Sequence, residues 1–513
     1  MFTITTICKN VSFSNYLVLQ ARLKSKTHWA KLKKKTSSKY KAMNHFDDFY
    51  GSVFGDKWKP MKEALLRRNK YVAVVNNYGE PEETIEFLTN RGAHCLNKLT
   101  SVQQEFYKQY PPEKIELSKQ NNGNNKLQDY REKLQTEEIS NLYHQKEAPE
   151  QLDFSDVSLK YSNEQEESKL NDSKSNYESA KEQTINHDID QSRIIDPSMG
   201  ISSEALYQYI PATKLKGMDD WVPESLHYSF YSKSNDFPLV IDPETEFKMP
   251  EHLKVYTYEM DSEWKMFPEP KRCTTGVYNY YPMDCGSVLA VLALCLAPGD
   301  RLLDLCSAPG GKALVALQTL LPDIVVCNDT SISRCNRQHR IFRDYLFDFN
   351  TSNKWRERVM FTNVDGRLFT DDQGFDKVLV DVPCTTDRHS VTEDENNIFR
   401  PDRIKERLRL PELQAQLLTN ALTLVRVGGA VVYSTCSLSP IQNDGVVHMA
   451  LKNAFQDHSI VAAVKDLTAS FAGLSSTLQL GSGDIAPQYG QLVVPTIGAN
   501  FGPSYIARLV RVK

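Results

Sequence analysis

Two cysteines stand at equivalent places in the second half of the chain. Cys384 lies in the segment DVPCTTD, and Cys436 lies in the segment YSTCSLSP. Each directly follows a short run of β-branched residues that is typical of a buried strand. Adjacent parallel strands would place both thiols at one crevice. A free thiol with a pKa of about 8.5 is only slightly ionised at neutral pH, so a reactive pair requires a site that lowers the pKa.

A thiolate beside a second proton-transfer group suits methylation of a pyrimidine at C5. That carbon is not nucleophilic, so a thiolate must first add at C6 to form an enamine-like intermediate. A general base must then remove the C5 proton before the thiolate leaves. Composition and spacing alone do not assign these two roles between Cys384 and Cys436.

A cofactor site is indicated by the segment DLCSAPGGK, Asp304 to Lys312. A strand, a stiff turn and two glycines precede a helix whose amide groups would face an anionic or carboxylate-bearing ligand. The spacing is neither that of a Walker A loop nor GxGxxG. Asp329, Asp365 and Asp381 each end a following strand, as a nucleoside-containing cofactor requires. S-adenosylmethionine is the natural candidate.

The elements that must position these residues lie between residues 275 and 513. Seven short β-branched runs alternate there with helical segments, which predicts an α/β fold with a mainly parallel seven-stranded sheet and helices on both faces. Such a Rossmann-like arrangement is that of the class I S-adenosylmethionine-dependent methyltransferases. The runs span residues 301–306, 324–329, 359–365, 377–382, 430–435, 459–464 and 504–512.

The remaining chain divides by composition. Residues 46–112 indicate a small N-terminal helical extension. Residues 113–197 hold 19 acidic and 11 basic residues and few large apolar ones, which favours a disordered acidic insert. Residues 198–274 are aromatic and proline-rich, and we expect an irregular lead-in that packs on the catalytic domain.

The first 46 residues hold ten Lys and Arg and no acid. This favours a mitochondrial targeting peptide over residues 1–45, with a basic nucleic-acid arm or a nuclear signal at Lys31 to Lys35 as alternatives. The whole chain of 513 residues is 40% hydrophobic and carries a net charge of −4, an ordinary globular composition. No apolar run is long enough for membrane insertion. The ten cysteines form neither a CxxC pair nor a zinc-ligand pattern, so no metal is expected.

The motifs DLCSAPGGK, NDTSISR, NVDGR, DVPC and STCS, in this order, resemble those of the NSUN family of RNA cytosine-5 methyltransferases. The resemblance covers about residues 46–95 and 200–513. It is strongest to the mitochondrial member that acts on small-subunit ribosomal RNA.

The resemblance implies a role for each matching residue. Cys436 would be the nucleophile, Cys384 would assist elimination and release of the product, and Asp381 would lie near the methyl group and the cytosine edge. The implied cofactor contacts are Gly310, Gly311 and Lys312 to the methionine part, Asp329 and Arg334 at the ribose, and Asp365 and Gly366 at the adenine.

The resemblance further implies S-adenosylmethionine as cofactor, mitochondrial small-subunit rRNA as substrate, the mitochondrial matrix as location, an mTERF-family protein as partner and a role in ribosome assembly. Two alternatives stay open: the same chemistry on mitochondrial tRNA, or a non-catalytic rRNA-binding assembly factor. An N-methyltransferase is disfavoured, because DVPC replaces the NPPY-type loop. For RNA contacts, Arg400, Arg403 and Arg407 would share one helix face, unless that face is simply solvated.

Overall fold

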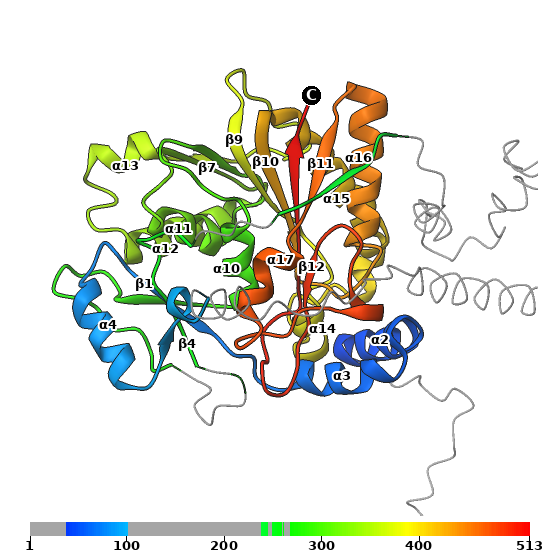
Figure 1. Ribbon diagram of the computed structural model, residues 1–513, viewed down its shortest axis with the longest axis horizontal. Coiled ribbons are helices and arrows are strands. Elements are labelled where there is room, and N and C mark those ends of the chain that lie inside the picture. Colours follow the sequence, from blue (N-terminus) through cyan, green and yellow to red (C-terminus); the bar gives the residue numbers. More distant parts are fainter. Residues whose placement is uncertain (1–36, 101–236, 245–248, 259, 261–266) are drawn as a thin grey trace, which may run out of the picture. The chain divides into compact units, whose positions relative to one another are not determined.

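The computed structural model describes residues 37–100, 237–244, 249–258, 260 and 267–513. Its larger sheet has the order β3-β11-β13-β10-β9-β6-β7-β8, with β12 paired to β13 (Figure 1). β13 is antiparallel to β10 and β11, while β10, β9, β6, β7 and β8 pair in parallel. The strands are β3 (Val240–Pro243), β6 (Arg301–Asp304), β7 (Ile324–Asn328), β8 (Val359–Thr362), β9 (Phe375–Asp381), β10 (Val425–Thr435), β11 (Ala462–Asp466), β12 (Gln491–Val493) and β13 (Ser504–Arg511).

All seven predicted strands are therefore present, and the α/β prediction with a mainly parallel sheet is confirmed. Two further strands, β3 and β12, join the sheet beyond the seven. β3 is only four residues long and largely exposed, so it lacks the apolar pattern by which the others were recognised.

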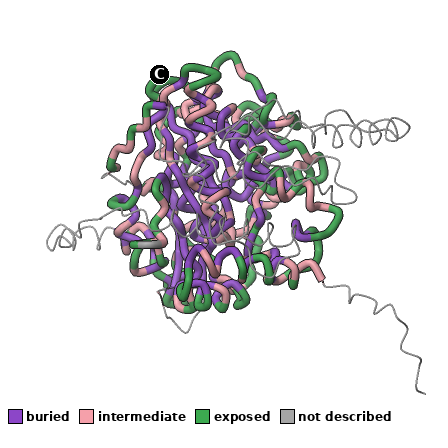
Figure 2. Tube along the Cα trace, turned by 90° about the vertical axis from the view of Figure 1, so that its right-hand side faces the viewer, coloured by how far each residue is buried: buried purple, intermediate pink, exposed green. Residues whose placement is uncertain are grey.

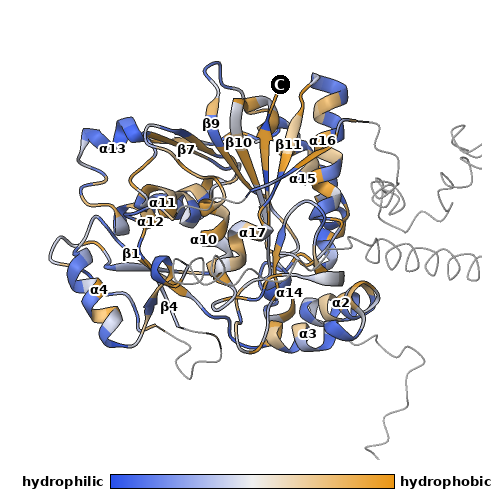
Figure 3. Cartoon of the chain, in the orientation of Figure 1, coloured by the Kyte–Doolittle hydropathy of each residue, from blue (hydrophilic) through white to orange (hydrophobic). Residues whose placement is uncertain are grey.

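Alternating residues of the central strands face two different cores. Val378 and Val380 of β9 join one apolar cluster with α15 and α16, whereas Leu379 between them joins a second cluster with α10 and α11. This is the two-residue period of a strand. The central strands consist mostly of buried residues, the buried residues gather in the interior of the tube in Figure 2, and strands such as β10 and β11 are largely hydrophobic in Figure 3. The helices of this part are α10 (Cys285–Leu292), α11 (Gly311–Gln318), α12 (Ile332–Tyr345), α13 (Asn353–Arg358), α14 (Asp387–Thr392), α15 (Ile404–Leu424), α16 (Asp444–His458) and α17 (Thr468–Phe471).

A second, antiparallel sheet has the order β2-β4-β1-β5. Its strands are β1 (Val72–Val75), β2 (His94–Cys95), β4 (Val255–Thr257) and β5 (Tyr280–Met283), and α4 (Pro81–Asn90) lies between β1 and β2 in sequence. The sequence prediction of a purely helical extension missed β1, because all four of its residues are buried. Val72 and Val74 join the core under α10, and Ala73 and Val75 join the core with α4, so no apolar–polar alternation is visible.

The first described elements are α2 (Ser38–Phe54) and α3 (Trp58–Leu66), which pack against α14. Ala42, Phe46 and Tyr50 of α2 are buried in the same core as α15. The boundary placed at residue 45 for a targeting peptide falls inside this helix. Residues 1–36, the acidic segment 113–197 and most of the lead-in lie outside the described residues.

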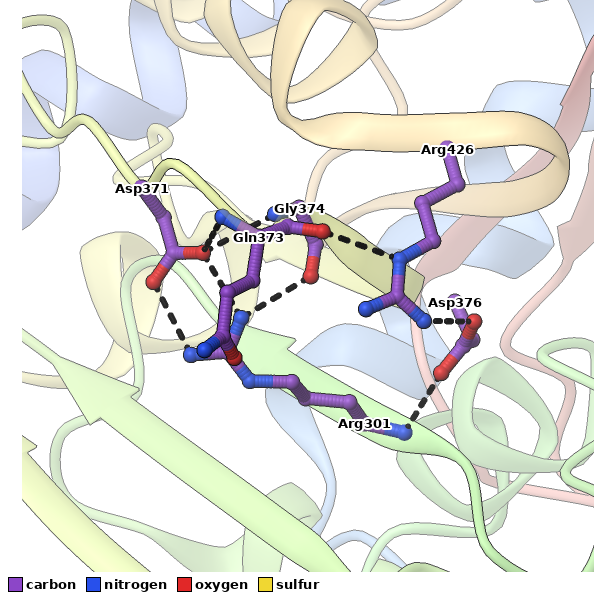
Figure 4. A network of polar contacts seen from close by, with 6 residues as sticks. All are labelled: Arg301, Asp371, Gln373, Gly374, Asp376 and Arg426. Carbon is purple, nitrogen blue, oxygen red and sulfur yellow. Dashed lines mark hydrogen bonds and ion pairs between the residues drawn. The ribbon is translucent and has the colours of Figure 1, made fainter.

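An ion-pair network ties together the starts of β6 and β9 (Figure 4). Arg301 forms a two-pronged contact with Asp371, with nitrogen-to-oxygen distances of 2.7 and 2.9 Å, and its guanidinium also donates to the Gly374 carbonyl. Asp376 accepts from the Arg301 amide and from Arg426. Because β6 and β9 are parallel, this network lies at their amino ends, and the predicted site residues follow their carboxyl ends. It stabilises the sheet without touching the site.

Candidate active site

The loop between β6 and α11 is shaped by a glycine that no other residue could replace. Gly310 has a φ of +100°, a region that side chains disfavour. A Cβ built there would lie 2.6 Å from Cγ of Gln338 on α12. Gly311 begins α11, and its Cβ would lie 3.0 Å from the Tyr281 hydroxyl. The loop therefore brings its backbone close to the start of α11, where the first amide groups of a helix have no partner within the helix.

Lys312, which is buried, and Asp381, which is partly exposed, form an ion pair beyond the carboxyl ends of the central strands. The Lys312 ammonium lies 2.7 Å from Oδ2 of Asp381, and the Ser434 hydroxyl donates to Oδ1 at 2.8 Å. Burial alone would lower the pKa of Lys312, but Asp381 and the nearby thiol and carboxyl groups raise it above its ordinary value. The lysine stays charged and holds the Asp381 carboxylate in one orientation.

Asp304, the last residue of β6, carries a carboxyl group that the sequence analysis did not assign. It is 1% exposed, and among the described residues neither oxygen has a partner with the geometry of a hydrogen bond; the nearby Ser307 hydroxyl offsets its burial only slightly. Burial, reinforced by Asp381, raises its pKa to about 7. An unpaired buried carboxyl is costly unless a ligand supplies the partner. The ammonium of a bound amino-acid moiety is such a partner, so Asp304 and the glycine loop fit S-adenosylmethionine.

Asp329 directly follows β7 and is buried. Its Oδ2 lies 3.2 Å from Nη1 of Arg334, and the same guanidinium also donates to the Ala308 carbonyl in the glycine loop. The structure thus brings together Asp329, Arg334 and the loop. Asp365 lies three residues beyond β8, where its ion pair with Arg367 lowers the pKa of the carboxyl.

Gly366, the remaining residue predicted at the adenine, has a packing reason to lack a side chain. A Cβ there would lie 2.8 Å from Cδ2 of Leu417 on α15. Its carbonyl also accepts a 2.7 Å hydrogen bond from the Asn420 side chain. The loop after β8 is therefore held against α15.

The two predicted thiols lie together. The backbone N–H of Cys436 donates to Sγ of Cys384 over 3.3 Å, and both side chains are partly buried. Hydrogen bonding from Cys436 lowers the pKa of Cys384, and the same contact raises the pKa of Cys436. The pair therefore holds one negative charge more readily than two. Of the two thiols, Cys384 is therefore the more readily ionised.

Asp387, at the start of α14, joins the loops that carry the two cysteines. Its carboxylate accepts from the Thr385 hydroxyl at 2.5 Å, from the Leu438 amide at 2.7 Å and from the Tyr50 hydroxyl of α2 at 2.6 Å. Its own amide donates to the Cys436 carbonyl at 3.1 Å. Burial raises the pKa of Asp387, and these donors oppose the rise. Asp387 ends the segment DVPCTTD, but the sequence analysis gave it no role, because its partners Tyr50, Ser437 and Leu438 are far from it along the chain.

The three arginines considered for RNA contact do not share a helix face. Arg400 precedes a 3-10 turn and pairs with Asp402, and Arg403 pairs with Glu406. Only Arg407 lies within α15, where its guanidinium stacks 4.5 Å from the centre of the Phe399 ring. Pro401 interrupts the regular spacing on which the expectation depended.

Comparison with known proteins places these motifs in a family. The model of the 16S rRNA methyltransferase RsmB/F family matches residues 291–483. The chain is 32% identical over 511 residues to the Caenorhabditis elegans 5-cytosine rRNA methyltransferase nsun-4, covering 99% of this chain and all of that protein. It is 45% identical over 249 residues to the Xenopus tropicalis 5-cytosine rRNA methyltransferase NSUN4, covering 48% of this chain and 60% of that protein.

Two more distant similarities extend the comparison. The Danio rerio mitochondrial tRNA (cytosine(34)-C(5))-methyltransferase is 33% identical over 300 residues, 56% of this chain and 71% of that protein. Among solved structures, NSun6 from Pyrococcus horikoshii with SFG aligns with a TM-score of 0.36 at 23% identity, over 48% of this chain and 57% of that one.

Proposed function

Because the chain belongs to the NSUN family of S-adenosylmethionine-dependent RNA cytosine-5 methyltransferases, we propose that it methylates a cytosine of mitochondrial small-subunit rRNA through a covalent bond between Cys436 and C6. The observation that carries the mechanism is the contact of Cys384 with Cys436 at the ends of adjacent strands β9 and β10. A protein that only bound RNA would have no use for two hydrogen-bonded thiols beside a lysine–aspartate ion pair.

In this mechanism Asp381 binds the edge of a cytosine that has left its base stack. Lys312 and Ser434 fix the direction of the Asp381 oxygens. Proton exchange over the contact between the thiols places the negative charge on Cys436, whose sulfur then adds to C6. The addition makes C5 nucleophilic. S-adenosylmethionine supplies the electrophilic methyl group that C5 takes up.

The second half of the reaction returns the enzyme to its starting state. After the proton that Cys384 took from Cys436 has passed to solvent, the Cys384 thiolate removes the proton from the methylated C5, and the bond between C6 and Cys436 then breaks. The Cys436 thiolate is released, and the two thiols again share one charge. This assignment gives the sulfur with the lower pKa the role of base and the other sulfur the role of nucleophile.

The cofactor would occupy the cradle between β6, β7 and the glycine loop. Gly310, Gly311 and Lys312 would contact its methionine part, with Asp304 at the ammonium. Asp329 and Arg334 would hold the ribose, and Asp365 and Gly366 would meet the adenine. The described contacts of Arg334 with both Asp329 and Ala308 support this placement, because they set the width of the cradle.

The proposed substrate is supported by the relatives named as 5-cytosine rRNA methyltransferases. The basic, acid-free N-terminal sequence supports delivery to the mitochondrial matrix, where an mTERF-family protein would present the rRNA during ribosome assembly. A second candidate substrate is mitochondrial tRNA, which the similarity to the Danio rerio tRNA enzyme favours.

Bisulfite sequencing of mitochondrial RNA, with and without this protein, tests the proposal. Loss of one 5-methylcytosine in small-subunit rRNA, restored by the wild type and not by Cys436→Ala, is the expected result. Loss of a mark in tRNA alone would establish the second candidate. Unchanged marks, with ribosome assembly rescued equally by Cys436→Ala, would show that the protein acts as a non-catalytic assembly factor.

A further inference from the structure

The N-terminal helices α2 and α3 contact the segment that carries the catalytic thiols. Both pack against α14, which begins three residues after Cys384 (Figure 1). Two consecutive residues of α14, Asp387 and Arg388, make these contacts with different partners. Asp387 points to the cysteine loops and receives the hydroxyl of Tyr50, while Arg388 reaches the end of α3.

Tyr50 is placed for a polar task although its ring is buried. Its side chain is 1% exposed, and the ring packs against Phe46 and Trp58 at centroid distances of 4.9 and 5.1 Å. A phenylalanine would fill the same space. The hydroxyl nevertheless lies 2.6 Å from the Asp387 carboxylate and 3.3 Å from the Ser437 hydroxyl, next to Cys436.

Asp387 depends on this donor because its carboxylate is fully buried. Three of its donors come from the cysteine loops themselves, namely Thr385, Ser437 and Leu438. Among the residues that the structure describes, Tyr50 is the donor from outside those loops. Loss of one donor to a buried carboxylate leaves a charge under-solvated, and the loops must move to compensate.

Arg388 fastens the other side of the same short helix. Its guanidinium donates to the carbonyls of Ala64, Leu65 and Arg67 at the end of α3, and to the Gly502 carbonyl and the Asn500 side chain before β13. The first three of these acceptors are backbone carbonyls of the last turn of α3 and of the residue after it, where a helix leaves carbonyls without partners inside the helix. The position of α14 is thus set by two elements far from it in sequence.

The backbone between the thiol and Asp387 is strained. Thr386 has a φ of +47°, in the left-handed region that threonine rarely adopts. Such a conformation persists only where the surroundings over-determine it. The bonds of Asp387 and Arg388 on either side of the chain supply that constraint.

From this arrangement we infer that Tyr50 is a positioning residue for catalysis: through Asp387 it sets the distance between the Cys384 and Cys436 thiols, so that α2 is a working part of the active site. The inference rests on the proposed roles of the two thiols. It predicts that loss of one hydroxyl slows methyl transfer without weakening the binding of cofactor or RNA.

The test compares Tyr50→Phe with Tyr280→Phe in the full-length protein. Tyr280, on β5 of the smaller sheet, is also fully buried, and its hydroxyl donates to the Pro268 carbonyl, so this variant loses one tyrosine hydrogen bond away from the thiols. Single-turnover methyl transfer is measured at saturating S-adenosylmethionine and RNA. Tyr50→Phe should be slower by about 10-fold or more, since a displacement of about 1 Å can cost roughly 100-fold. Its KM values should stay within about twofold of the wild type, and Tyr280→Phe should keep the wild-type rate.

The pH profile of Cys384 alkylation supplies a readout that general destabilisation would not move. In Tyr50→Phe the profile should shift to higher pH, because the displaced Cys436 amide stabilises the Cys384 thiolate less well. Arg388→Lys, which keeps the charge and loses the forked contacts, should lower the rate in the same way.

Two results would overturn the inference. One is a wild-type rate and an unshifted profile in Tyr50→Phe while Cys436→Ala is inactive. The other is an equal loss of rate in Tyr50→Phe and Tyr280→Phe. Full activity of Cys436→Ala would instead refute the proposed function on which the inference rests.

Discussion

Replacing Asp304 by Asn should change how the stability of the cofactor-free protein depends on pH. Burial raises the pKa of this carboxyl to about 7 in the folded protein, whereas an exposed aspartate has a pKa of about 3.9. Between these two values the folded state holds a proton that the unfolded state has lost. As the pH rises through this range, the free energy of unfolding therefore falls. It stops falling above the pKa that Asp304 has in the folded protein.

The size of the effect follows from the difference of about three pKa units. At about 1.4 kcal/mol per unit, the cost reaches about 4 kcal/mol at high pH, of which about 3 kcal/mol develops between pH 5 and pH 8. Asparagine has nearly the same shape and cannot ionise. The free energy of unfolding of Asp304→Asn, relative to the wild type, should therefore rise by about 3 kcal/mol over that interval.

Urea unfolding of both proteins without cofactor, at intervals from pH 5 to pH 8, measures this difference. The same variant should bind S-adenosylmethionine more weakly in calorimetry, by roughly 30-fold, since a hydrogen bond to a charged group contributes about 2 kcal/mol. A stability difference that is flat with pH would refute the reasoning about burial. Unchanged cofactor affinity would refute the assignment of Asp304 to the cofactor ammonium.

Three further outcomes are expected. With Cys384→Ala, attack should proceed and elimination should slow, so that a protein–RNA adduct accumulates on denaturing gels, whereas Cys436→Ala should form no adduct. Gly310→Ala should lose cofactor binding in calorimetry, because its φ of +100° and its close neighbours exclude a Cβ. Arg301→Met should lower the free energy of unfolding by about 2 kcal/mol, since it removes the charged partner of Asp371, and should leave the methyl-transfer rate unchanged; a slowed reaction would contradict the separation of that network from the site.

The strands and the strand-end residues could be predicted because their signals are local. A run such as VLV before Asp381 is apolar, short and followed by a polar turn, so both the strand and its functional end are readable. The strand β1 was missed for the opposite reason. Burial on both faces removes the alternation that distinguishes a half-buried strand from a helix segment.

The contacts that hold the thiols in place could not be predicted from local pattern. Tyr50 and Asp387 are 337 residues apart. Asp387 ends the segment DVPCTTD, but nothing in that segment indicates that Tyr50 is its partner. Asp304 did carry a signal, an acidic residue inside an apolar run, but only the structure shows that its oxygens lack a partner among the described residues. Both the contact of Tyr50 with Asp387 and the lack of a partner at the Asp304 oxygens result from tertiary packing.

The smaller sheet also determines how the fold responds to insertions or chain cleavage within residues 101–236. β2 precedes residues 101–236 and β4 follows them, yet the two strands pair directly, with Cys95 opposite Tyr256. The pairing of β2 with β4 therefore holds the chain before residue 101 next to the chain after residue 236. Doubling the length of a closed loop costs only about 0.6 kcal/mol, so insertions there weigh little on folding. A protease cut within residues 101–236 would yield two fragments that remain associated, with α2 still joined to the strands it shares a core with.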